Sequence, residues 1–178
     1  MLKVFAVIGA VLVAGIAIVL VLAAMKPDEF RVQRSAAIKA PPEKVFSLIN
    51  DYKSWSAWSP WETKDPAMKR TYGATTSGKG ATYAWDGNSQ VGAGNMLITD
   101  AQMASKIALD LNMTRPMTAH NKIEFALIPA GDTTTVTWSM RGETPYFAKI
   151  IHVFLNMDKM VGGDFEAGLQ KLKAAAEK

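Results

Sequence analysis

Few side chains in this 178-residue sequence are suited to acid–base, nucleophilic or metal chemistry. Cysteine is absent, which excludes thiol nucleophiles, thiolate metal sites and disulfides. The histidines are His120 and His152, and two isolated histidines are weak material for a metal site. The sequence has no glycine-rich phosphate loop and no serine-elbow motif. The residues themselves therefore predict no catalytic group, no metal and no cofactor.

Arg34 is the charged residue in the least expected position. Alternation along its segment puts Arg34 on the same side as Val32 and Ile38, so a strand here would turn the guanidinium inward. There it could pair with an acid or with the polar head of a ligand, although a bulge or a strand end would explain the pattern equally well. His152, beside the apolar stripe of the last helix, is a second possible polar contact.

A long amphipathic helix at the end of the chain must position much of the interior. The spacing of apolar residues by three and four predicts a helix over Pro145–Ala176, broken or bent at Gly162 and Gly163 into two segments along one surface. The stripe consists of Phe147, Ile150, Ile151, Phe154, Met157, Val161, Phe165, Leu169 and Leu172.

The residues before this helix alternate with the period of strands. Strands are predicted at 30–38, 68–75, 81–85, 92–98, 107–113, 123–127 and 136–140. The first and the last three alternate cleanly between one apolar and one polar side, whereas 68–75 is a weak strand. Asp86, Gly87 and Asn88 predict a turn, and Gly92 and Gly94 a bulge or tight bend. After the first strand, proline at position 42 suits the first turn of a short helix, and a second short helical segment follows.

An uncharged segment, Val4–Met25, precedes the strands and is bracketed by Lys3 and Lys26. At about 1.5 Å per residue, this segment is long enough to cross a bilayer. We interpret residues 1–26 as a single-pass membrane anchor and 27–178 as the folded domain, expected on the non-cytoplasmic side. A cleaved signal peptide and a buried core helix are the alternatives.

The charge balance argues against nucleic acid as a partner. The chain carries 20 basic and 16 acidic residues, for a net charge of +4. Two of the basic residues, Lys3 and Lys26, flank the apolar segment, so the rest of the chain is nearly neutral. It has no basic run and no stripe of alternating basic and aromatic residues.

Several motifs resemble those of a known family. The segments Ala40–Phe46 and Ile49–Asp51, the run from Trp58 to Trp61, and Asp164–Lys173 are similar to the polyketide cyclase/dehydrase-like branch of the SRPBCC superfamily. These domains are related to START lipid-transfer domains and to the birch-pollen allergen. The resemblance covers Phe30–Lys178. It implies an α+β helix-grip fold, in which a curved antiparallel sheet surrounds a long C-terminal helix and two short helices follow the first strand.

The inward-facing residues are large and adaptable, which is typical of a pocket for an apolar ligand but also of an ordinary core. Since helix-grip domains commonly leave a cavity between sheet and helix, the resemblance favours the pocket. The predicted cavity lining consists of Tyr83, Trp85, Met96, Leu109, Leu111, Phe125, Trp138, Met140, Phe147 and Phe154, with Met113 and Met157 on the same faces.

Trp55, Trp58 and Trp61 recur every three residues. They could guard a pocket entrance or enter a membrane interface. Alternatively, they cap the end of the sheet and donate their indole N–H groups to nearby carbonyls.

Together these features predict a membrane-anchored domain that binds a hydrophobic small molecule or lipid, for carriage or sensing, without transforming it. One alternative is a cyclase- or dehydratase-type enzyme, for which His152, Tyr83 and Arg34 would have to converge in the cavity. The other is a fully packed module that acts through its surface on a protein partner.

Overall fold

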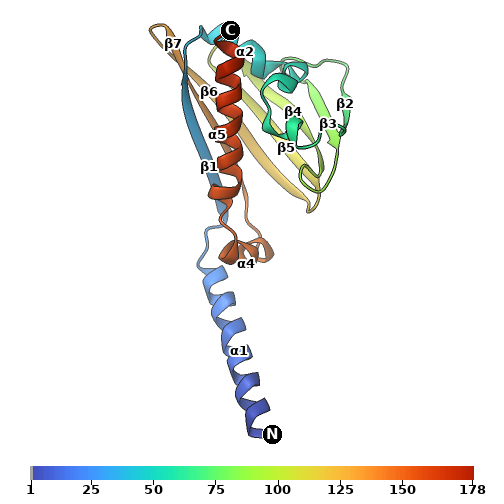
Figure 1. Ribbon diagram of the computed structural model, residues 1–178, viewed down its shortest axis with the longest axis vertical. Helices are drawn as coiled ribbons and strands as arrows, with labels where there is room; N and C mark the ends of the chain where they lie inside the picture. Colours follow the sequence, from blue (N-terminus) through green and yellow to red (C-terminus); the bar gives the residue numbers. More distant parts are fainter. Residues whose placement is uncertain (1) are drawn as a thin grey trace.

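Figure 1 shows an N-terminal helix that projects from a domain made of one sheet and a long C-terminal helix. The computed structural model describes residues 2–178, with side chains from Val4 onward. The helices are α1 (Leu2–Ala24), α2 (Pro42–Asn50), the 3-10 helix η1 (Tyr52–Ala57), α3 (Pro60–Lys64), α4 (Tyr146–Phe154) and α5 (Met157–Ala176). The strands are β1 (Glu29–Ile38), β2 (Lys69–Tyr72), β3 (Thr82–Asp86), β4 (Ala93–Gln102), β5 (Lys106–Arg115), β6 (Ala119–Ala130) and β7 (Thr133–Glu143).

The seven strands form one antiparallel sheet in the order β1-β7-β6-β5-β4-β3-β2. From β2 to β7 each strand pairs with the next one in the chain, and the last strand, β7, also pairs with β1 at the edge of the sheet. The short helices α2, η1 and α3 connect β1 to β2 at one end of the sheet, and α5 lies along β1 (Figure 1). The predicted α+β helix-grip architecture is confirmed, with three short helical segments between β1 and β2 where two were predicted.

Alternation in the strands places the apolar side chains on the α5 side. In β6 and β7, for example, Phe125 and Trp138 are directly opposite each other and fully buried, while their neighbours on the outer side are more exposed. The predicted bulge is present, since Gly92 has a positive φ of 63° and the β4–β5 register shifts between Ala93 and Gly94. Helix α2 begins at a proline, as predicted.

The last helical region breaks at a different place from the one predicted. Leu155 is extended, with φ −110° and ψ 132°, and the Asn156 side chain accepts the Lys159 N–H at 3.0 Å to begin α5. Gly162 and Gly163, where the break was predicted, lie inside α5. A side-chain cap therefore decides the boundary, whereas the glycines are held helical by the packing of α5 on β1.

The two segments also do not share one surface. α5 buries Phe165, Leu169 and Leu172 against the sheet, whereas α4 packs against α1. α1 is apolar, and its stretch Val4–Ala24 is long enough to cross a membrane and is exposed except at Val19 and Ala23. Length and composition of this kind fit a membrane anchor and a signal sequence alike.

Candidate functional site

Aromatic rings fill the space between the centre of the sheet and α5. Trp138 of β7 stacks on Phe165 of α5, with ring centroids 4.0 Å apart and planes within 9° of parallel. Phe125 lies 4.8 Å and Trp58 5.6 Å from the same indole, measured between centroids. All four side chains are fully buried. The central part of the predicted cavity is therefore packed core.

Most of the predicted lining does face this interior. Buried on the inner side of the sheet are Tyr83, Met96, Leu109, Phe125, Trp138 and Met140, and half-buried there are Trp85, Leu111 and Met113. Phe147 and Phe154 do not, because α4, which ends at the break at Leu155, lies away from the sheet and packs on α1. Their exposed fractions are 67% and 72%, so neither ring lies between the sheet and α5 as predicted.

The tryptophan triplet closes one end of this core. The indole N–H groups of Trp55 and Trp58 donate to the carbonyls of Ile49 and Leu48, at 2.8 and 2.9 Å. Both side chains are buried. Trp61 is half-buried and packs edge-on against Trp138, at 5.7 Å between centroids. This geometry agrees with the capping interpretation of the triplet.

Arg34 points from β1 toward α5, as its position in the strand predicted. Its Nη1 and Nη2 donate to the two carboxylate oxygens of Asp158 at 2.8 and 3.0 Å, and its Nε donates to Glu166 at 2.5 Å. These hydrogen bonds raise the pKa of Arg34 and lower that of Asp158. The guanidinium also lies against Gly162, where an added Cβ would be 2.1 Å from Nη2. Arg34 therefore clamps α5 to the sheet edge.

A polar cluster that the sequence reasoning missed surrounds Tyr83. Its hydroxyl donates to Glu62 at 3.0 Å, and the same carboxylate accepts from Arg70 at 2.8 Å. The Glu62 side chain is only 9% exposed. Burial, and then the neighbouring Glu62 charge, raise the pKa of the Tyr83 phenol. The cluster joins three consecutive elements, α3, β2 and β3, but its contacts depend on how α3 packs against the edge of the sheet, which no residue spacing predicted.

A hollow of about 340 Å³ lies where the domain meets α1. We call it the foot hollow. Its apolar wall comes from the start of β1 and from the α4–α5 junction: Phe30, Val153, Phe154, Leu155 and Met157. Its polar groups come from Lys26, Glu29, Thr144, His152 and Asn156. The His152 ring stands perpendicular to Phe30 at 6.3 Å, and burial, followed by the Lys26 charge, lowers its pKa.

A second hollow, of about 610 Å³, lies on the sheet and has charged walls. Its lining includes Arg31, Asp110, Lys122, Glu124 and Arg141. These residues alternate with the buried core residues along their strands, so they belong to the outer side of the sheet. The foot hollow is therefore the better candidate for an apolar ligand.

An enzyme of the predicted alternative type would need Arg34, Tyr83 and His152 to lie together, but each has different neighbours. Arg34 on β1 and Tyr83 on β3 are five strand-to-strand steps apart, about 24 Å along the sheet at roughly 4.8 Å per step. Arg34 is bound by acids of α5, Tyr83 by Glu62, and His152 packs on Phe30. The geometry gathers no catalytic set from these residues.

Residues 29–177 match the sequence profile of the family described as polyketide cyclase / dehydrase and lipid transport. The match covers the whole sheet and the helices that close it. The chain belongs to this family. The resemblance seen in the sequence motifs, to the polyketide cyclase/dehydrase-like branch of the SRPBCC superfamily, is thereby confirmed.

Solved structures show the same fold at low sequence identity. Protein CV1439 from Chromobacterium violaceum is 13% identical with a TM-score of 0.60, and the match covers 86% of this chain and 99% of that one. Major latex-like protein 151 from Panax ginseng is 10% identical with a TM-score of 0.60, over 85% of this chain and 100% of that one. The Aha1 dimer from Colwellia psychrerythraea is 18% identical with a TM-score of 0.55, and the match covers 83% of this chain and 96% of that one. No curated protein matches the sequence.

Proposed function

We propose that this member of the polyketide cyclase/dehydrase and lipid transport family is a membrane-anchored binding protein for a hydrophobic small molecule or a lipid. It carries or senses this ligand without transforming it. The anchor is the exposed apolar helix α1, with the folded domain on the non-cytoplasmic side. Lipid transport is part of the family's own description, and the first residues of the domain follow α1 directly.

The foot hollow carries the proposal. Its volume falls in the range of small-molecule sites, about 300 to 1,000 Å³. Its wall joins apolar side chains such as Phe30 and Met157 to polar ones such as Lys26 and His152, which suits a ligand with an apolar body and a polar head. It lies beside the end of α1, so an apolar ligand leaving a bilayer would meet it before any other part of the domain. The packed rings of Trp138 and Phe165 would confine the ligand to this end of the interior.

Native mass spectrometry of the full chain tests the binding site. The protein, in nonionic detergent, is offered oleic acid and phosphatidylglycerol and is then released from the micelle. We expect one bound molecule per chain. Met157→Trp, which fills the foot hollow, should raise the Kd of the ligand roughly tenfold, equivalent to about 1.4 kcal/mol. Met160→Trp is the matched control, because Met160 is 54% exposed on the same helix and outside the hollow.

A bound molecule that both variants retain equally would be annular lipid and would contradict a site at the foot hollow. An absence of any adduct would favour the second candidate function, a packed module that acts on a protein partner through its surface. The observation that favours this candidate is the fully buried aromatic cluster in place of a central cavity.

A further inference from the structure

Helix α4 presents its apolar side outward and its charged side inward. The apolar residues Phe147, Ile150, Ile151 and Phe154 recur with helical spacing, and we call them the α4 stripe. The two phenylalanines are 67% and 72% exposed. Lys149, by contrast, is only 8% exposed, and its Nζ lies 2.5 Å from the Asp28 carboxylate. A helix facing water would have the opposite orientation, so the α4 stripe needs an apolar environment.

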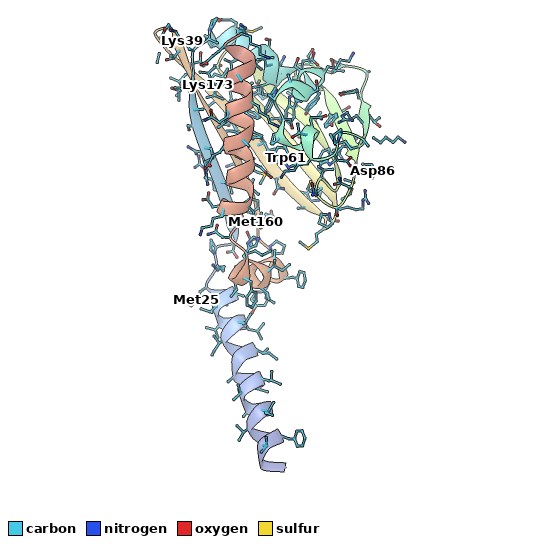
Figure 2. All side chains as sticks on the ribbon, in the orientation of Figure 1. Met25, Lys39, Trp61, Asp86, Met160 and Lys173 are labelled. Carbon is cyan, nitrogen blue, oxygen red and sulfur yellow. The ribbon has the colours of Figure 1, made fainter. Side chains whose placement is uncertain are left out.

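The position of α4 indicates what that environment is. α4 packs on the last turns of α1, where Val19 is half-buried and Ala23 fully buried. The Tyr146 hydroxyl donates to the Leu20 carbonyl at 2.9 Å. In Figure 2, the exposed Met25 lies at the end of α1 and Met160 at the lower end of α5, with α4 between them. The α4 stripe therefore continues the apolar surface of α1.

The depth of this contact matches that of a helix lying in a membrane surface. Leu20 precedes the end of α1 by four residues, which is about 6 Å along the helix at 1.5 Å per residue. Amphipathic helices in the membrane interface bury their apolar side by about 5 to 10 Å. Tyrosine at this level is also common, because its ring is apolar while its hydroxyl finds a polar partner.

We infer that α4 is an in-plane membrane helix whose apolar stripe enters the lipid beside α1. This inference rests on the proposed anchoring by α1 and deepens it. The single span would then be accompanied by a second contact, and the two together would fix how the domain stands on the bilayer. The foot hollow, which shares Phe154 with the stripe, would open at the headgroup level.

Spin labels on single cysteines test the inference, and the natural absence of cysteine makes this direct. The full chain is reconstituted into phosphatidylcholine–phosphatidylglycerol vesicles with a label at Phe147→Cys or Phe154→Cys. Ile128→Cys is the matched control, because Ile128 is an equally exposed apolar residue, at 61%, near the far end of β6. A label at Val13→Cys reports on α1 itself.

Oxygen concentrates in lipid, whereas a water-soluble nickel chelate stays in the aqueous phase. We expect oxygen to relax the labels at 147 and 154 severalfold more than the chelate does, and the chelate to relax the label at 128 more than oxygen does. The inference is overturned if 147 and 154 behave like 128 while the label at 13 lies in the bilayer. If the label at 13 is also accessible to the chelate, the proposed anchor itself fails. Strong dipolar broadening between labels at 154 that disappears on dilution with unlabelled chain would assign the stripe to a second copy, and would also overturn the inference.

Discussion

At the scale of single residues, one contact explains why a glycine stands in the middle of a helix. Gly162 gives the Arg34 guanidinium room to reach Asp158 and Glu166, whereas Gly163, the next residue, has nothing within 4 Å of an added Cβ. Glycine in a helix interior is less favourable than alanine by about 1 kcal/mol. An alanine at position 162 and an alanine at position 163 should therefore change the stability of the protein differently.

We predict opposite outcomes for the two alanine substitutions. Gly163→Ala should raise the free energy of unfolding by about 0.5 to 1 kcal/mol, because it gains helix propensity without a clash. Gly162→Ala should lose that gain or lower stability, because the guanidinium must leave its two carboxylates. Urea denaturation in nonionic detergent measures both. In an Arg34→Met background Gly162→Ala should become favourable, and equal effects of Gly162→Ala in both backgrounds would contradict the clamp.

The raised pKa of the Tyr83 phenol predicts that the protein loses stability at alkaline pH. Its pKa is raised above the ordinary value of 10.0 by burial and by Glu62, so the folded protein holds this proton more tightly than the unfolded chain. The protonated phenol therefore makes its full contribution to the free energy of unfolding below about pH 10, and this contribution falls as the pH rises further. Tyr83→Phe should flatten this decline in denaturation midpoints measured between pH 9 and 11, whereas Tyr146→Phe, at an exposed position, should not. An unchanged decline in Tyr83→Phe would contradict the assignment.

At the scale of elements, periodicity predicted whether a segment is a strand or a helix. It predicted less well where the segment ends and which element it packs on. The strands from β5 to β7 and the start of α2 follow from alternation and from one proline. The break between α4 and α5 depends on whether Asn156 turns its side chain back to the Lys159 N–H, and asparagine makes such caps only in a suitable backbone. The apolar stripe likewise continues across this break in the sequence, although its first half, on α4, lies beside α1 and away from the sheet.

This difference between the two helices predicts different costs for the same substitution. Phe165→Ala in α5 should destabilise the protein by about 3 to 5 kcal/mol, because it removes a fully buried ring stacked on Trp138. Phe147→Ala in α4 should change stability in detergent by less than about 0.5 kcal/mol, because its ring is exposed. Chemical denaturation of the full chain compares them. A large cost at Phe147 would mean that α4 packs on the domain and not on the lipid.

At the scale of the whole molecule, the candidate site could be predicted only in part. Family motifs indicated the sheet and the C-terminal helix that it surrounds, and alternation indicated which residues face the interior. Neither showed that Trp138 and Phe165 would stack and fill the centre, because the fit of rings from β7 and α5 depends on packing between distant segments. The foot hollow also forms from residues 26–30 and 152–157, which meet only in the folded chain.

These same long-range contacts predict that the domain does not swing freely on α1. The Asp28 carbonyl accepts the Thr144 N–H at 2.7 Å, the Asp28 carboxylate binds Lys149, and Tyr146 reaches Leu20. Spin labels at Val13→Cys and Ile128→Cys in vesicles should therefore give one narrow distance distribution in pulsed EPR. Asp28→Asn combined with Tyr146→Phe should broaden it, because the buried Lys149 ammonium loses its carboxylate and α4 its bond to α1. Asp132→Asn, which removes the exposed pair with Lys39 at the opposite end of β1, should leave the distribution narrow. A broad distribution in the unsubstituted chain would mean that the α1–α4 contact does not persist in the bilayer, and the foot hollow would then have no fixed position relative to the lipid.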